Sequence, residues 1–232
     1  MWPPRKHRIL PGGGRVAPAW LLSAPVDSTR MELRKKRVCV FCASAAGISP
    51  QYLQAAAELG RLIAERGYGL VYGGAVVGAM GALADGSLTA CGEVVGVIPD
   101  VIRDLEIEHR GLTELHVVPT MHERKALMAS LADAFVALPG GYGTLDEFIE
   151  IVTWAQLRIH AKPCVLVNLG GFYNGLLRFL DHVVAEGLIQ PGARGLIQVA
   201  AHPAEALAVI EQTWAERAEI PPHDARLDSV MR

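Results

Sequence analysis

The segment A-F-V-A-L-P-G-G-Y-G-T-L-D-E-F, residues 134–148, decides the fold of this chain. Its apolar first part predicts a buried β-strand, a turn with three glycines follows, and a helical pattern continues to about His160. A strand that leads through a glycine turn into a helix is the repeating unit of α/β proteins. The segment therefore predicts one such unit, with its turn at the carboxyl end of the strand.

The same alternation of strand and helix patterns extends on both sides of this segment. Apolar runs predict strands at residues 37–43, 68–72, 93–99, 114–119 and 164–168, and a weaker strand at 195–200. Helical spacing predicts helices at residues 50–66, 79–90, 121–131, 173–186 and 203–215. Continuous apolar strands indicate a mostly parallel sheet with helices on both faces. With right-handed crossovers, this predicts an α/β fold with a single Rossmann-like doubly wound domain.

The two ends of the chain lack this alternation. Residues 1–34 are rich in proline and glycine, which predicts a disordered N-terminal extension, and Met31 is a plausible alternative start. Residues 35–215 form the predicted Rossmann-like nucleotide hydrolase domain. Residues 216–232 are polar and contain prolines, which predicts a loose C-terminal tail.

Bulk composition excludes several classes of partner. The chain is 51% hydrophobic and 20% charged, its net charge is −2, and its pI is about 6.4. No global basic field exists to attract nucleic acid or a membrane surface. No apolar run reaches the ~18 residues of a membrane span, so we expect a cytoplasmic protein. Local positive groups would have to hold a small anionic substrate.

The four cysteines predict buried small hydrophobic residues in a reducing compartment. They are Cys39, Cys42, Cys91 and Cys164. Cys39 and Cys42 form a C-x-x-C pair, which could indicate redox chemistry. Because they lie three residues apart along a predicted strand, they should point to opposite faces of the sheet. This geometry disfavours the redox interpretation.

The glycine turn of residues 140–144 is a candidate anion site. Gly140, Gly141 and Gly143 remove β-carbons just before a helix, so backbone N–H groups and the helix amino terminus could approach a phosphate. Thr144 could cap the helix or donate its hydroxyl to the anion. A tight strand-to-helix turn without a ligand is the alternative.

Glu147, three residues after Thr144, has two interpretations from the sequence alone. It could be the carboxylate partner of a capping box. It could instead face the cleft beside the turn, where a carboxylate stabilises an oxocarbenium ion or activates water in glycoside cleavage. Asp146 and Glu150 are expected to be solvated on other parts of the helix surface.

Two further segments follow predicted strands and face the same rim. In Y-G-G-A-V-V-G-A-M-G, residues 72–81, the glycines could contact an anion or ribose, or could only let a helix pack closely on a strand. In M-H-E-R-K, residues 121–125, Arg124 and Lys125 could grip a phosphate or hydroxyl, although such cations are more often solvated. His122 and Glu123 do not form H-E-x-x-H, and no other cluster has zinc spacing, so no metal site is predicted.

The quoted residues resemble a known family. P-G-G-Y-G-T-L-D-E is similar to the P-G-G-x-G-T-x-x-E signature of the LONELY GUY family of cytokinin riboside 5′-monophosphate phosphoribohydrolases. An older label for this family is lysine decarboxylase. The motifs F-C-A-S, V-Y-G-G, M-H-E-R-K-A and V-T-W-A-Q-L also occur in family order, and the resemblance runs from about Val38 to Trp214.

The resemblance implies roles for individual residues. Arg124 and Glu147 match the catalytic pair of the family. The positions that the glycine turns and the resemblance together assign to substrate binding are Ser44, Gly73, Gly74, Glu106, Lys125, Gly140, Gly141, Tyr142, Gly143, Thr144 and Thr153.

The implied activity is hydrolysis of the N-glycosidic bond of N6-substituted adenosine 5′-monophosphates, which gives a free base and ribose 5-phosphate. The resemblance implies no cofactor, a nucleoside 5′-monophosphate as the partner molecule, and a homodimer that uses helices near residues 121–131 and 144–160. The alternatives are a general AMP nucleosidase, a non-catalytic nucleotide-binding module, and a pyridoxal-phosphate lysine decarboxylase. The last would need Lys125 or Lys162 for a Schiff base.

Overall fold

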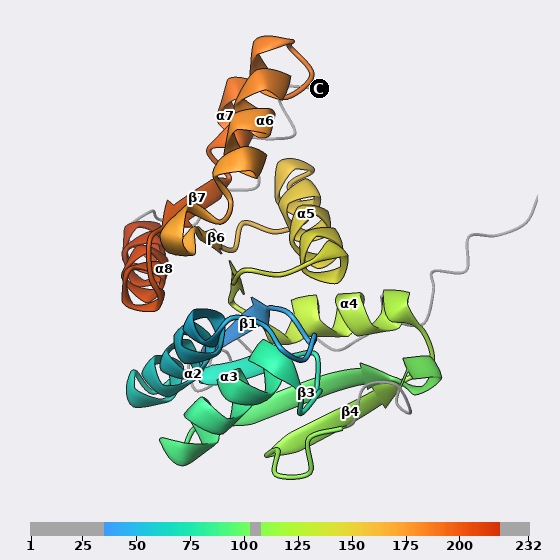
Figure 1. Cartoon of the computed structure of the whole chain (residues 1–232). Helices are drawn as coiled ribbons and strands as arrows, with labels where there is room; N and C mark the ends of the chain where they lie inside the picture. The colour runs from blue at the N-terminus through green and yellow to red at the C-terminus, as the bar shows by residue number, and fades with distance from the viewer. Residues whose placement is uncertain (1–34, 103–107, 219–232) are drawn as a thin grey trace, which may run out of the picture. The chain divides into compact units, whose positions relative to one another are not determined.

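A computed structural model describes residues 35–102 and 108–218 of the chain. These residues form a seven-stranded sheet in the order β4-β3-β2-β1-β5-β6-β7, and every paired neighbour is parallel (Figure 1). The strands are β1 (Arg37–Phe41), β2 (Gly69–Tyr72), β3 (Val94–Pro99), β4 (Glu114–Val118), β5 (Ala134–Ala137), β6 (Cys164–Val167) and β7 (Ile197–Ala200). The predicted doubly wound class is confirmed.

Helices cover both faces of the sheet because the central strands are apolar on both sides. The α-helices are α2 (Pro50–Glu65), α3 (Gly78–Thr89), α4 (Met121–Leu131), α5 (Tyr142–Gln156), α6 (Asn174–Ala185), α7 (Pro191–Arg194) and α8 (Pro203–Ala218). Two 3₁₀ turns, η2 (Asp100–Ile102) and η3 (Leu169–Gly171), follow strands. One hydrophobic cluster joins the sheet to α2, α3 and α8, and a second joins the opposite face to α4, α5 and α6.

The strand order contains one reversal. From β1 the chain moves outward through β2 and β3 to the edge strand β4, then returns through α4 to β5 on the other side of β1. It continues outward through β6 to β7. The loops that leave the carboxyl ends of β1 and β5 diverge at this switch point, where doubly wound sheets bind their ligands. The fold therefore predicts the position of a site before any side chain is considered.

Most predicted boundaries agree with the structure to within two residues, but α5 ends at Gln156 and not near His160. Arg158 adopts a left-handed conformation with φ of 59°, and its N–H donates to the Ala155 carbonyl. This is the usual way to close a helix, although glycine commonly occupies the position. Helix α8 is longer than predicted, since it ends at Ala218, three residues past the expected limit at 215.

The cysteine predictions are confirmed in part. Cys39 and Cys42 belong to the hydrophobic clusters on opposite faces of the sheet, and Cys164 is also buried. The prediction for Cys91 is wrong, because this residue is exposed after the end of α3, where its φ of 58° turns the chain. None of the described helices combines the length and apolarity that a membrane crossing needs.

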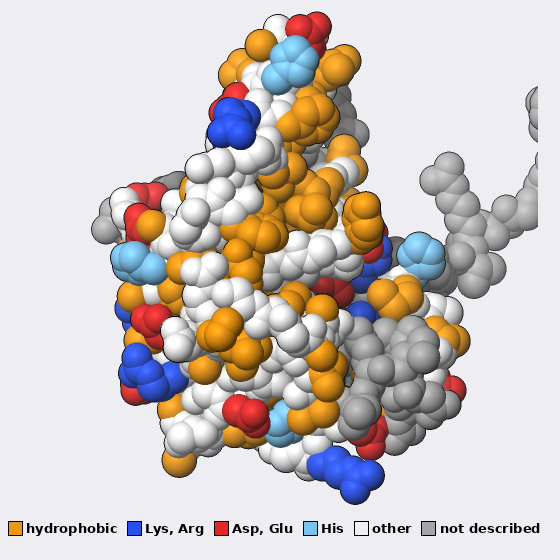
Figure 2. All heavy atoms as spheres, viewed as in Figure 1, with side chains coloured by type: hydrophobic (Ala, Val, Ile, Leu, Met, Phe, Trp, Pro, Cys, Tyr) orange, Lys and Arg blue, Asp and Glu red, His pale blue; other side chains and the backbone are white. Residues whose placement is uncertain are grey.

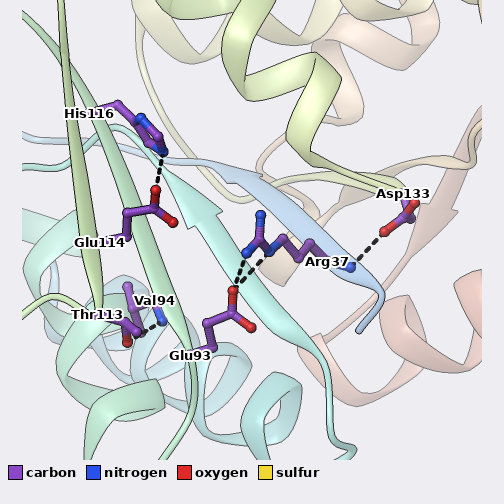
Figure 3. Close-up of polar contacts among 7 residues, drawn as sticks. All are labelled: Arg37, Glu93, Val94, Thr113, Glu114, His116 and Asp133. Atoms are coloured by element: carbon purple, nitrogen blue, oxygen red, sulfur yellow. Dashed lines mark hydrogen bonds and ion pairs between the residues drawn. The ribbon is translucent and has the colours of Figure 1, made fainter. Parts of the chain in front are cut away.

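Polar contacts fix the amino ends of the central strands (Figure 3). The Arg37 side chain at the start of β1 reaches across β2 to the Glu93 carboxylate before β3, and its Nε donates over 2.9 Å. Its backbone N–H donates to Asp133 before β5, over 2.8 Å. These contacts join β1, β3 and β5 at the edge of the sheet opposite the switch point, so strand register is fixed from both ends.

Close helix packing on one face depends on two glycines. A β-carbon on Gly60 of α2 would lie 2.0 Å from the Leu83 carbonyl oxygen of α3, and one on Gly86 would lie 2.2 Å from the Ala57 carbonyl oxygen. Both obstacles are backbone atoms, which cannot rotate away. The two helices therefore approach at a distance that alanine at either position prevents.

We expect Gly60→Ala and Gly86→Ala each to lower the free energy of unfolding by about 1–3 kcal/mol, because the helices must separate. Urea denaturation followed by circular dichroism measures the effect. Gly175→Ala in α6 is the matched control, since its added β-carbon meets no atom within 4 Å. An equal loss of stability in all three variants would contradict this account.

Candidate active site

A pocket of about 320 Å³ lies at the switch point, between the carboxyl ends of β1 and β5. Four segments line it: the loop after β1, and the amino-terminal parts of α3, α4 and α5. The lining residues are Cys42, Ala43, Ser44, Ala45, Met80, Met121, Arg124, Gly141, Gly143, Thr144, Asp146 and Glu147. The structure thus brings together residues that lie about a hundred positions apart in the sequence, as the strand order requires.

Arg124 is buried in the pocket wall with only 3% of its surface exposed. It lies in the first turn of α4, which begins after the Thr120 cap, whose hydroxyl accepts from the Glu123 N–H. Its Nε donates to the Val97 carbonyl over 3.1 Å and its Nη2 donates to the Gly73 carbonyl over 3.1 Å. The guanidinium is therefore held by backbone atoms of β3 and of the turn after β2, and it is not the solvated charge that the spacing alone left open as an alternative.

Glu147 is the buried carboxylate of the pocket, with 5% of its surface exposed. Its Oε1 lies 3.6 Å from Nη1 of Arg124, so the two form a buried ion pair between α5 and α4. The capping residue of α5 is Gly141, and no side chain caps this helix. Glu147 is consequently not a capping-box partner, and the cleft-facing interpretation is the one that the geometry supports.

The carboxylate changes the acidity of the nearby thiols. Burial raises the pKa of Cys42, and the negative charge of Glu147 raises it further. Burial and Glu147 also raise the pKa of Cys39, against smaller opposing effects that include the positive charge of Arg124. Both thiols therefore stay protonated at neutral pH, which makes them poor nucleophiles. The C-x-x-C pair has no redox geometry or reactivity.

The glycine turn places the amino terminus of α5 against the pocket. Gly141 and Gly143 line it, and the buried Thr144, 4% exposed, lies in the first turn of the helix and not at its cap. Gly140 and Gly141 also line a smaller, apolar cavity of about 270 Å³ next to the pocket. Helix amino termini with uncapped N–H groups and small residues favour anions. Tyr142 is 94% exposed and lies outside the pocket wall.

Gly73 supports Arg124 from behind and does not line the pocket. A β-carbon at this position would lie 2.1 Å from Nη2 of Arg124, so only glycine leaves room for the guanidinium. Gly74 also lies off the pocket wall and has a φ of 84°, which turns the chain after β2. The second glycine turn thus serves close packing around the catalytic candidate.

Lys125 forms a second bridge between α4 and α5. Its Nζ lies 3.1 Å from Asp146 and 3.0 Å from Glu150. Burial lowers the pKa of this amine, but the bonds and charges of the two carboxylates outweigh that effect and raise it. Asp146 is exposed, as predicted, whereas Glu150 is half-buried, and both carboxylates pair with Lys125.

Of the remaining residues predicted to contact substrate, one lines the pocket, one lies away from it and one is outside the described part of the chain. Ser44 lines the pocket, in the loop after β1. Thr153 lies further along α5, exposed, with its hydroxyl bonded to the Ile149 carbonyl over 2.8 Å. Glu106 lies outside the described residues. Sequence patterns missed the thioethers of Met80 and Met121, whose only signal was their place beside the second glycine turn and at the start of α4.

No group of three or more histidine, cysteine, aspartate or glutamate side chains in residues 35–102 and 108–218 is arranged to hold a metal ion. The described histidines that contact other residues have structural partners: His109 bonds Asp85 over 3.0 Å, and His160 bonds the Ile151 carbonyl over 2.9 Å. The groups that this pocket presents are an uncapped helix amino terminus, a carboxylate and a guanidinium.

A doubly wound sheet with an anion-binding turn and a buried carboxylate at its switch point defines a Rossmann-like protein with a small-molecule site. The family model described as "Possible lysine decarboxylase" matches residues 80–210. A cytokinin riboside 5′-monophosphate phosphoribohydrolase of Rhodococcoides fascians is 48% identical over 84% of this chain and 97% of its own length. Another from Arabidopsis thaliana is 48% identical over 81% of this chain and 86% of its own. The chain belongs to the LONELY GUY family, as its signature predicted.

Solved structures place the fold in a wider group. The molybdenum cofactor carrier protein of Chlamydomonas reinhardtii aligns with a TM-score of 0.61 and 27% identity, over 78% of this chain and 99% of that protein. A molybdenum cofactor binding protein of Rippkaea orientalis aligns with a TM-score of 0.58 and 23% identity, over 78% and 98% of the two chains. The latter likeness concerns the fold alone.

We expect Arg124→Met to lower the free energy of unfolding by about 3–5 kcal/mol, because it leaves the Glu147 carboxylate buried without its cation. Chemical denaturation at neutral pH measures the loss. Arg61→Met is the matched control, since its ion pair with Glu65 is about half exposed and should contribute below ~1 kcal/mol. Equal losses of unfolding free energy in both variants would show that the buried ion pair stabilises the fold no more than the exposed one does.

Proposed function

We propose that this chain hydrolyses the N-glycosidic bond of N6-substituted adenosine 5′-monophosphates, such as cytokinin riboside 5′-monophosphates. The products are the free base and ribose 5-phosphate. The observation that carries the proposal is the buried Glu147, paired with Arg124, on the helix whose amino terminus forms the anion site. The printed names of the relatives, which are phosphoribohydrolases at 46–50% identity, support the same activity.

The 5′-phosphate occupies the turn of Gly141, Gly143 and Thr144 in this proposal. Backbone N–H groups and the dipole of α5 balance its charge. Glu147 lies further along the same helix, so a nucleotide held by its phosphate presents its ribose to the carboxylate. Holding the substrate at a remote phosphate positions the sugar for reaction.

Bond cleavage proceeds through a ribose that carries positive charge at C1′ and O4′. The C1′–N bond breaks, its electron pair leaves with the base, and the Glu147 carboxylate stabilises the oxocarbenium ion. Glu147 then accepts a proton from the water that bonds to C1′, and the base gains a proton. Two backbone carbonyls hold Arg124 beside the carboxylate, so it orients Glu147 or the ribose hydroxyls.

The family resemblance is the basis for four further proposed substrate contacts, which are Ser44, Lys125, Thr153 and Glu106. Ser44 has the most direct support, since it lines the pocket opposite the glycine turn. Met80 and Met121 add polarisable apolar walls that suit a base with a hydrophobic substituent. A general AMP nucleosidase would use the same phosphate site, so the preference of the pocket for the base separates the two activities.

The placement of the lysines disfavours a pyridoxal-phosphate decarboxylase. The Lys125 amine is bound by Asp146 and Glu150, and the Lys162 amine donates to the Ala129 carbonyl over 2.8 Å. No lysine is among the residues that line the pocket. A Schiff base needs an amine at the reacting centre, so the older family label does not fit this site.

We also propose that the protein acts as a homodimer in the cytoplasm. Ile149, Leu157 and Ile159 are exposed on α5 or just after it, between 37% and 65% of their surface. Figure 2 shows hydrophobic side chains gathered over the part of the molecule where α5 and α6 lie in Figure 1. Exposed apolar patches of this kind mark protein interfaces. The free cysteines support a reducing compartment.

Release of ribose 5-phosphate from a panel of nucleotides and their matching nucleosides tests the activity. We expect adenosine and N6-isopentenyladenosine monophosphates to react far better than the nucleosides, because only an anion uses the donors of the glycine turn fully. Glu147→Gln should lower turnover by ~10²-fold or more while nucleotide binding survives. The activity should persist in a chelator.

The matched control is Glu123→Gln, which makes the same substitution on the exposed side of α4 and should retain wild-type turnover. Near-normal turnover in Glu147→Gln, or nucleosides that react as well as monophosphates, would refute the proposed site. Binding without release of ribose 5-phosphate from any nucleotide would favour the non-catalytic alternative.

Gly73→Ala tests the role of Arg124 separately from the carboxylate. The added methyl group occupies the place of Nη2, and a flexible side chain can move aside, so the fold should survive. Displacement of a catalytic group by about 1 Å costs on the order of 10²-fold in rate. We expect turnover to fall on this scale while the thermal midpoint changes by only a few degrees. Unchanged turnover would exclude Arg124 from catalysis.

A further inference from the structure

A further cavity lies on the edge of the sheet opposite the active site. It measures about 610 Å³ and is bounded by the end of α5, the amino ends of β6 and β7, and the last turns of α8. The active site lies at the carboxyl ends of the strands, so the two are separated by the length of the sheet. None of the proposed catalytic or substrate-binding residues lines this cavity.

Four side chains of the basic amino acids line the cavity: Arg158, His160, Lys162 and Arg217. No aspartate or glutamate is among its described lining residues. Arg158 and Arg217 are both exposed, and neither forms an ion pair with a carboxylate in the described part of the chain. The positive charges of these two arginines are therefore not balanced by an acid in residues 35–102 and 108–218.

The positive charges beside the cavity also affect the pKa of His160. Burial lowers its pKa, a bond to the Ile151 carbonyl opposes this, and the charges of Lys162 and Arg217 lower the pKa further. Burial is the largest of these effects on the pKa, and the two cationic neighbours act in the same direction. Both ring nitrogens of His160 are already bonded within the chain, Nε2 to the Ile151 carbonyl and Nδ1 to the Lys162 N–H, so the ring forms part of the fixed wall of the cavity.

Backbone conformation at Arg158 adds an independent observation. Its φ of 59° is left-handed, a conformation that glycine adopts without strain and other residues adopt at a cost of about 1 kcal/mol. The conformation projects a guanidinium from the end of α5, beside the cavity. Arginine is also the residue best suited to bidentate contact with phosphate oxygens.

We propose that this cavity is a second binding site, which takes a small phosphate-bearing anion between Arg158 and Arg217. The two guanidinium groups reach it from different elements, α5 and α8, so the anion would join them. The volume exceeds that of inorganic phosphate and leaves room for an organic part against Ile159 and Leu196. The site is independent of the proposed hydrolase activity, since it shares no residue with it.

Calorimetric titration of the full chain with pyrophosphate, inorganic phosphate and ribose 5-phosphate tests the proposal, at constant ionic strength set with chloride. Because the active site also binds phosphate, the comparison is between variants. Arg158→Gly/Arg217→Gln should lose one of two binding events, seen as at least tenfold weaker affinity. Arg178→Gln is the matched control, which removes one exposed positive charge from α6, outside the cavity.

Arg158→Gly also separates binding from folding, since glycine relieves the left-handed conformation and should keep or raise the thermal midpoint. Equal affinities in wild type, control and double variant would overturn the site. Equal binding of succinate and pyrophosphate would overturn the assignment to phosphate. The phosphate that binds most tightly identifies whether a free ion or an organic phosphate is the occupant.

Discussion

The buried contact between Arg124 and Glu147 is the interaction on which the site depends. Three features hold the arginine: the Val97 carbonyl, the Gly73 carbonyl and the carboxylate itself. A charge buried to this extent is tolerated only when its donors are satisfied. The strand ends of β2 and β3, the start of α4 and the second turn of α5 must all be in place for this to happen. The remaining elements serve to hold these four together.

The polar frame at the opposite edge of the sheet complements this contact. Arg37 fixes β1 relative to β3 and β5 at their amino ends, and the Lys125 bridge fixes α4 against α5 on the outside of the Arg124–Glu147 pair. The pocket is thus rigid on the sides that carry its charges. A pre-organised carboxylate stabilises developing positive charge without reorganising during the reaction, which is the largest source of rate in many hydrolases.

Much of the fold follows from patterns that are local in the sequence. Apolar runs and glycine turns predicted the strands, and the family signature pointed to Glu147 and Arg124. The burial of Arg124 could not be predicted, because its two carbonyl partners lie 27 and 51 residues away and meet it only through the strand order. The end of α5 was misplaced because an arginine, not the usual glycine, occupies its left-handed position. Cys91 was predicted to be buried but is exposed, because it too occupies a left-handed position after the end of a helix.

The strand order has a consequence for how the active site comes into existence. Strands β1 to β4 and α4 contain the arginine and both of its carbonyl partners, whereas the carboxylate and the glycine turn lie beyond β5. The halves meet where β5 pairs with β1 and where α4 contacts α5, and the bond between Arg37 and Asp133 spans 96 residues. Long-range pairing of this kind carries a high entropic cost and forms slowly. A nascent or partly unfolded chain therefore holds half of the chemistry at most, so hydrolysis of cellular nucleotides is confined to the completed molecule.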